Sequence, residues 1–98
     1  MRVVFVPQAR EEILEAAAYY RDRSSQAAER FSGDIAGTVD LLLQFPGVGT
    51  SISRNARRLL LKNFPYHFIY RVEGDEIRVY AVAHLKRKPG YWRKRLPG

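Results

Sequence analysis

Apolar side chains change their spacing at Pro46-Gly47, near the middle of the 98-residue chain. Upstream they recur every three or four residues, which predicts two helices, over residues 8–23 and 26–44. Downstream they alternate with polar residues, as in strands that bury one face. A short β-branched run over residues 2–6 precedes the first helix and predicts an initial strand. The sequence therefore predicts an α+β fold of order β-α-α-β-β-β.

The second half predicts three strands, over residues 57–63, 66–73 and 76–85, and residues 50–56 are predicted to be a loop because they show no clear period. Gly74-Asp75 is a two-residue connection of the kind that closes a hairpin. Ser24-Ser25 is equally short, so the two helices are expected to form a hairpin on one face of an antiparallel sheet that includes the first strand. The length suits one domain over residues 1–98.

Gly33 and Gly37 are unusual inside a predicted helix, where each costs about 1 kcal/mol relative to alanine. Four residues apart, they share one helix face. We expect this face to let the alanine-rich first helix approach closely.

Residue parity separates the two faces of the predicted sheet. In the last strand it assigns Ile77, Val79, Ala81 and Ala83 to the face under the helices, and Arg78, Tyr80, Val82 and His84 to the other. Across the three strands, the open face is expected to carry seven polar or charged side chains: Arg58, Lys62, His67, Arg71, Arg78, Tyr80 and His84. A basic face with aromatic and histidine side chains suits phosphate and base contacts. An ordinary solvated sheet face gives the same pattern.

Charge is divided unevenly along the chain, whose net charge is +7. Residues 1–50 contain five arginines and seven acidic residues, net −2, whereas residues 51–98 contain twelve basic and three acidic residues, net +9. This asymmetry indicates an anionic partner for the second half. Charge that only keeps a small protein in solution is the alternative interpretation.

Several classes of protein do not fit the composition. Without cysteine, the chain has no disulfide framework, thiolate metal site or catalytic thiol. Its two histidines lack ligand-like spacing with carboxylates, and it has neither a glycine-rich phosphate loop nor a nucleophile elbow. No apolar run is long enough to cross a membrane or form the core of a signal peptide. We therefore expect a cytoplasmic protein with no metal and no cofactor.

RNA cleavage through attack of the 2′-hydroxyl fits the remaining residues, because this reaction needs an acid and base, and cations for the phosphate, but no metal. His84 is the candidate acid or base. Arg58 and Arg87 are candidates to hold the phosphate, and Tyr91 and Trp92 to stack on a base, with Tyr91 also able to transfer a proton. Alternatively, His84 is a strand-end residue bonded to the backbone, and Tyr91 and Trp92 form an apolar plug.

The predicted catalytic set is thus Arg58, His84 and Tyr91. The predicted nucleic-acid-binding set consists of seven further basic side chains of the second half: Arg54, Arg57, Lys62, Lys86, Arg87, Lys88 and Arg93.

Residues 57–70, 77–84 and 87–92 carry, in order, features of a known superfamily. Two features of the first half agree with the same superfamily: Ala9–Ile13 at the start of the first helix, and Tyr19-Tyr20 near its end. On these stretches the chain resembles the RelE/ParE toxin superfamily over nearly its whole length. The resemblance implies a small basic toxin of a type II toxin–antitoxin pair, of the plasmid stabilisation type. It also implies a cognate antitoxin that covers the toxin in a hetero-oligomer.

The superfamily divides by target. RelE-like members cleave mRNA on the ribosome with Arg, Lys and Tyr side chains, whereas ParE-like members poison DNA gyrase and lack that set. Tyr91 matches the RelE-type C-terminal tyrosine and Arg58 falls near a strand arginine. Leu85 stands where a basic residue is expected, and the Phe64–Tyr66 turn and His84 are more similar to the ParE branch or to an uncharacterised branch.

The first expectation is therefore a toxin that attacks translation as a metal-independent endoribonuclease. The alternatives are a ParE-like gyrase poison without nuclease chemistry and a non-toxic, nucleic-acid-binding relic. In each case we expect a partner whose acidic, amphipathic segment covers the two helices or the sheet edge.

Overall fold

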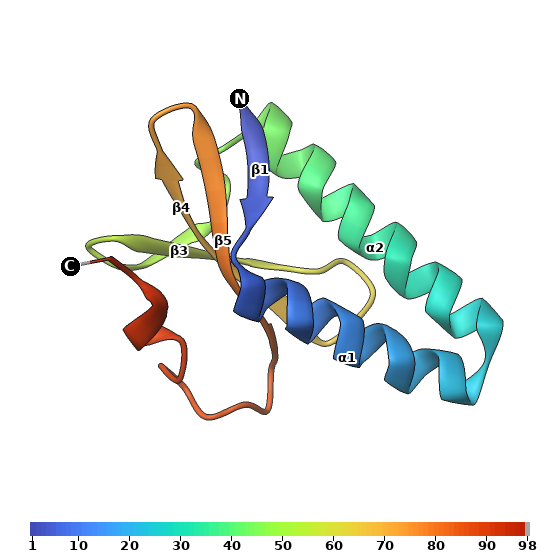
Figure 1. The fold of residues 1–98 in the computed structure, drawn as a ribbon. Coiled ribbons are helices and arrows are strands. Elements are labelled where there is room, and N and C mark those ends of the chain that lie inside the picture. Colours follow the sequence, from blue (N-terminus) through green and yellow to red (C-terminus); the bar gives the residue numbers. More distant parts are fainter. Residues whose placement is uncertain (98) are drawn as a thin grey trace.

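The computed structural model describes residues 1–97 and contains a five-stranded sheet with two long helices (Figure 1). In chain order the elements are β1 (Arg2–Phe5), α1 (Pro7–Arg23), α2 (Ser25–Gln44), β2 (Thr50–Ser53), β3 (Ala56–Leu60), β4 (Tyr66–Glu73), β5 (Glu76–His84) and a short 3-10 turn, η1 (Arg93–Arg95). The α+β class and the predicted order of a strand, a helical hairpin and then strands are confirmed. Over the described residues, neither helix is long and apolar enough to cross a membrane.

The sheet has the strand order β1-β5-β4-β3-β2 and is mixed. The first strand does pair within the sheet, but it runs parallel to β5, whereas all other neighbours are antiparallel. The pairing covers only Arg2–Phe5 against Glu76–Val79. Pro7 then opens α1, where a missing N–H costs nothing, and the chain leaves the sheet. The second half of β5 therefore has no strand beside it on this edge.

The predicted loop over residues 50–56 is wrong, because Thr50–Ser53 forms the edge strand β2, paired with β3. The strand is mostly polar because it lies at the exposed edge, so it lacks the alternation that marks a half-buried strand. The strand predicted over 57–63 ends at Leu60. Beyond it, the buried Asp34 carboxylate accepts the amide N–H groups of Asn63 and Phe64 at 2.9 and 3.0 Å, which draws the chain towards α2.

A β-bulge in β5 corrects the predicted faces of this strand. Tyr70 pairs with Val79, but its neighbour Ile69 pairs with Ala81, so Tyr80 is an extra residue. From this point parity is inverted. Val82 and His84 lie on the helix side, paired with Phe68 and Tyr66, whereas Ala81 and Ala83 lie on the other face. The prediction for these four residues is therefore wrong, because alternation was counted through the bulge.

Between the helices and the sheet lies the main core, whose fully buried side chains include Phe31, Leu42, Phe68, Tyr70, Ile77 and Val79. Aromatic rings join the helices to the end of the sheet: the Phe31 ring lies 5.3 Å from Tyr20, 5.4 Å from Phe64 and 5.4 Å from Tyr66. These offset and edge-on contacts add to the area that is buried.

The second face of the sheet is covered in part by the C-terminal segment, residues 85–97 (Figure 1). Trp92 is 5% exposed and packs with Ala56, Ile69 and Ala81, which together form a second apolar cluster. The alternative interpretation of Trp92 as an apolar plug is confirmed. The alanines leave room for the indole, so the inverted parity of β5 is what lets the C-terminal segment dock.

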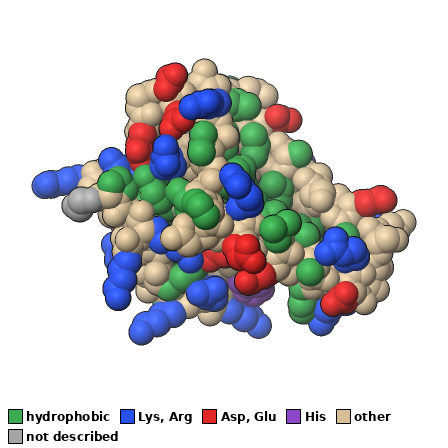
Figure 2. Space-filling model, viewed as in Figure 1, with side chains coloured by type: hydrophobic (Ala, Val, Ile, Leu, Met, Phe, Trp, Pro, Cys, Tyr) green, Lys and Arg blue, Asp and Glu red, His purple; other side chains and the backbone are tan. Residues whose placement is uncertain are grey.

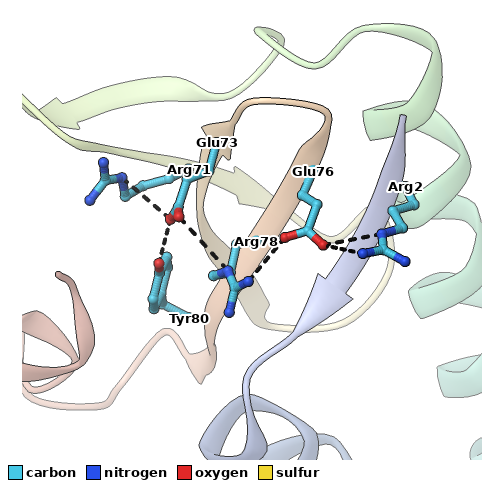
Figure 3. A network of polar contacts seen from close by, with 6 residues as sticks. All are labelled: Arg2, Arg71, Glu73, Glu76, Arg78 and Tyr80. Atoms are coloured by element: carbon cyan, nitrogen blue, oxygen red, sulfur yellow. Dashed lines mark hydrogen bonds and ion pairs between the residues drawn. The ribbon is translucent and has the colours of Figure 1, made fainter.

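A chain of ion pairs and hydrogen bonds crosses the strands at the hairpin end of the sheet (Figure 3). Glu76 accepts from Arg2 at 2.6 Å and from Arg78 at 3.0 Å, which joins β1 to β5. Glu73 accepts the Tyr80 hydroxyl and lies 3.6 Å from Arg71. These pairs neutralise two arginines of the predicted open face, so the free cations of that face lie at its other end.

Candidate functional site

A cavity of about 270 Å³ lies between the second face of the sheet and the C-terminal segment. Four of its lining side chains are cations, Arg58 from β3 and Arg87, Lys88 and Arg93 from the C-terminal segment. His67 of β4 lies among them, and no acidic residue lines the cavity. We call this cavity, defined by these five residues, the basic pocket. Figure 2 shows basic side chains gathered over the C-terminal segment, at the lower left. Such a concentration of positive charge attracts phosphate groups.

His67 is the titratable group of the basic pocket. It is half-buried, and its Nδ1 is buried without a hydrogen-bond partner in residues 1–97. Burial, assisted by the positive charge of Arg58, lowers the pKa of His67 below its usual 6.5. The imidazole is therefore neutral at pH 7, and one of its two ring nitrogens is an acceptor, although Nδ1 itself is shielded from solvent. The sequence placed His67 on the open face but gave no sign that it would be enclosed there.

His84 lies away from the basic pocket. The bulge turns it to the helix side, where its ring packs edge-on against Tyr66 at 5.1 Å. It lines another hollow with Glu12 and Glu15 of α1 and with Arg87, which the basic pocket shares. Its Nδ1 accepts the Lys86 amide N–H at 3.0 Å, as expected for the alternative of a strand-end histidine bonded to the backbone.

Tyr91 lines the basic pocket, but its hydroxyl donates a hydrogen bond to the carboxylate of Glu12, a residue that does not line this pocket. The Arg87 guanidinium lies 3.8 Å from the centre of the Tyr91 ring and covers one of its faces. Burial and the bond to Glu12 raise the pKa of Tyr91 far above its usual 10. Of the predicted catalytic set, the structure brings Arg58 and Tyr91 to one cavity and leaves His84 out.

The predicted nucleic-acid-binding set is spread over several surfaces. Arg87, Lys88 and Arg93 line the basic pocket, and Lys86 is exposed beside them. Arg57 is half-buried and donates to the carbonyl oxygens of Gly47 and Gly49, at 3.3 and 2.8 Å, so it supports the loop before β2. With Arg54 it lines another hollow, at the β2–β3 turn. Lys62 belongs to a groove beside α2.

That groove, of about 720 Å³, runs between α2 and the β3–β4 connection. Its apolar lining includes Leu41 and Leu60, which are 37% and 54% exposed. Gly33 and Gly37 open onto it, and a Cβ built at either would meet nothing within 4 Å. The expected close approach of α1 at these glycines is therefore wrong, because they face the groove. We call it the α2 groove.

No group of three or more His, Cys, Asp or Glu side chains within residues 1–97 lies close enough together to hold a metal ion. The polar side chains that line the basic pocket are those of Arg58, His67, Arg87, Lys88, Tyr91 and Arg93.

Comparison with known proteins identifies the family. The model of the ParE toxin of type II toxin–antitoxin systems, parDE, matches residues 3–89. The chain belongs to the ParE toxin family. It is therefore a member of the RelE/ParE superfamily and a toxin of the type II class, for which a cognate antitoxin is the expected partner. A search of curated proteins gives no match.

A solved structure from the chromosomal ParDE TA system of P. aeruginosa has a similar fold. It has a TM-score of 0.74 and 24% sequence identity, and the match covers 86% of this ParE-family chain and 95% of the other. At 24% sequence identity, the similarity shows that the two chains share a fold.

Proposed function

We propose that this ParE-family toxin stops growth by binding DNA gyrase in complex with DNA, without nuclease chemistry of its own. The observation that supports this proposal is the separation of the residues that RNA cleavage would use. His84 lies on the helix side of the sheet, and the Tyr91 hydroxyl is bonded to Glu12. His84 and Arg58 thus lie on opposite faces of the sheet, and the Tyr91 proton is engaged by a carboxylate instead of being free for a substrate.

The basic pocket and the exposed cations around it supply the binding surface for this target. Arg58, Arg87, Lys88 and Arg93 form no ion pair with any described residue, so their charge is available to phosphate oxygens. Each phosphate that is neutralised releases counterions and adds about one unit to the log–log salt slope of binding. A complex with gyrase and DNA should therefore weaken steeply as salt is raised.

The test is a supercoiling assay with purified gyrase and relaxed plasmid. The wild-type protein should produce gyrase-dependent DNA breaks and loss of supercoiling. Replacing both Arg58 and Arg93 with alanine should abolish the effect, whereas His84→Ala should retain it. The matched control replaces both Arg21 of α1 and Arg30 of α2 with alanine, which removes two exposed positive charges elsewhere. Unaltered supercoiling at doses that stop growth would contradict the proposal.

Ribosome-dependent mRNA cleavage is the second candidate, and the neutral His67 beside Arg58 is the observation that favours it. A neutral imidazole can take the 2′-hydroxyl proton while the cations stabilise the phosphate. In a translation extract, this candidate predicts discrete mRNA cuts that vanish in His67→Ala and persist in His84→Ala. Intact mRNA at toxic doses excludes it. Normal growth when the chain is expressed without an antitoxin would favour the non-toxic relic.

The cognate antitoxin is proposed to place an acidic, amphipathic helix in the α2 groove. Leu41 and Leu60 are exposed there, and the cations Arg30 and Lys62 flank them, so an apolar stripe bordered by carboxylates would complement the groove. Leu60→Glu should abolish co-purification with the antitoxin. Val72→Glu, at an exposed apolar position outside the groove, is the matched control, and equal loss in both variants would contradict this placement.

A further inference from the structure

Glu12 lies where three separate parts of the chain meet. It belongs to the second turn of α1, and its side chain is only 11% exposed. One carboxylate oxygen accepts the Val82 amide N–H of β5 at 2.9 Å, and the other accepts the Tyr91 hydroxyl. Arg95 donates to both oxygens, at 2.9 and 3.2 Å. Removing any of these donors would leave the buried negative charge of Glu12 incompletely paired, which costs free energy.

The position of Glu12 follows from the sheet topology. Parallel pairing of β1 with β5 stops at Val79, so the outer edge of β5 beyond this point has no neighbouring strand. The Glu12 carboxylate accepts a hydrogen bond from the Val82 amide N–H, and Arg95 donates one to the carbonyl oxygen of Tyr80 at 2.9 Å. The two side chains thus satisfy backbone groups that a longer β1 would have paired.

The C-terminal segment needs such an anchor because its positively charged side chains repel one another. It contains six basic residues and no acidic residue. Within residues 1–97, the carboxylate that binds this segment is that of Glu12, through hydrogen bonds from Tyr91 and Arg95 and the ion pair with Arg95. Trp92 attaches the same segment to the second face of the sheet through apolar contacts. The segment is therefore held by an apolar plug on one side and one carboxylate on the other.

We propose that Glu12 is a positioning residue that keeps the C-terminal segment closed on the sheet. Closure sets where Arg87, Lys88 and Arg93 stand relative to Arg58, and so gives the basic pocket its shape. In the absence of the Glu12 charge, the segment opens while the helices and the sheet stay folded. The effect on toxicity rests on the proposed function, because it assumes that the basic pocket faces the target.

Trp92 reports the position of the segment directly, since it is the only tryptophan of the chain. The experiment compares full-length wild-type protein with Glu12→Gln and Glu12→Ala by acrylamide quenching of Trp92 and by its emission maximum, because the side chain is only 5% exposed when the segment is closed. Hydrogen bonds to a charged group shift a local opening equilibrium by about tenfold or more, so the open fraction reported by acrylamide quenching should rise about tenfold in Glu12→Ala. Glu12→Gln should lie between, because its amide oxygen can still accept from Val82.

Glu15→Gln is the matched control, because Glu15 is exposed on the same helix and forms no hydrogen bond with a described residue. It should leave Trp92 as shielded as in the wild-type protein. Arg95→Gln should loosen the segment in the same direction as Glu12→Gln, and the double variant should show less than the sum of the two effects, since both variants remove the Glu12–Arg95 ion pair. Additive effects, or a Trp92 that stays shielded in Glu12→Ala, would overturn the proposal.

Toxicity separates positioning from a merely structural role. Glu12→Ala should be about tenfold less toxic than Glu15→Gln at equal expression, with Glu12→Gln between them, an unchanged far-ultraviolet circular dichroism spectrum and undiminished binding to the antitoxin. An exposed Trp92 with full toxicity would overturn the positioning role. If wild-type protein does not affect gyrase, the proposed function fails, and the Trp92 measurements still decide whether Glu12 holds the segment.

Discussion

The hydroxyl of Tyr70 offers a sharp test of how the loop before β2 is held. Tyr70 is fully buried in β4, where its hydroxyl donates to the Pro46 carbonyl at 2.8 Å and accepts the Gly49 amide N–H at 2.8 Å. Removing it in Tyr70→Phe leaves the ring in place but deprives both backbone groups of their partner.

The cost follows from how well water can replace the hydroxyl. Gly49 is buried, so its N–H stays unsatisfied, whereas Pro46 is half-buried and its carbonyl can be partly rehydrated. An unsatisfied buried group costs about 1–3 kcal/mol, so we expect a total loss of about 2 kcal/mol. For a domain of this size, each kcal/mol lowers Tm by about 4–8 °C, which predicts a decrease of about 8–16 °C.

Thermal and urea unfolding of Tyr70→Phe measure this loss. Tyr19→Phe is the matched control, because Tyr19 is 49% exposed and no described residue bonds to its hydroxyl. The control should change the free energy of unfolding by less than about 0.5 kcal/mol. Equal stability of the two variants would refute the reasoning that one hydroxyl anchors the loop.

Three further results are expected. Asp34→Ala should cost about 3 kcal/mol in urea unfolding, because two backbone N–H groups at Asn63 and Phe64 lose a buried carboxylate; a loss below 1 kcal/mol would contradict this. Gly49→Ala should destabilise the fold, since a Cβ would lie 2.7 Å from the Tyr70 ring, and an unchanged Tm would show that the loop can move. Burial and the bond to Glu73 raise the pKa of Tyr80 to about 12, so its contribution to stability is complete below pH 10 and is lost as pH rises towards 12. Tyr80→Phe should reduce the alkaline loss of stability over this range, and the remainder belongs to tyrosines such as Tyr66, whose pKa burial also raises to about 12; an unchanged alkaline profile would contradict this.

The elements that the sequence predicted correctly are those with local signals. Both helices follow from apolar spacing within single turns, and Ser24 caps the second through a bond from the Ala27 N–H. The β4–β5 hairpin follows from Gly74, which adopts the positive φ of 61° that its turn requires. Each signal lies within a few residues of the element that it determines.

The candidate site was predicted only in part, and the bulge at Tyr80 is the main reason. The sequence around it, Val79–Val82, is apolar on both parities, so alternation gives no sign of an extra residue. One slip inverted every later side chain of β5, which moved His84 to the helix side and gave Trp92 a place on the other face. Glu12 was missed because a glutamate in an early helical turn resembles any solvent-exposed acid.

The sequence by itself determined the order of helices and strands, the concentration of positive charge in the second half and the resemblance to a toxin superfamily. These depend on local periodicity and composition, which the chain carries whatever its tertiary structure. Tertiary structure alone decided which cations meet around His67, which face holds His84 and what anchors the C-terminal segment. The partners of Glu12 are 70, 79 and 83 residues away along the chain, a separation that no local pattern encodes.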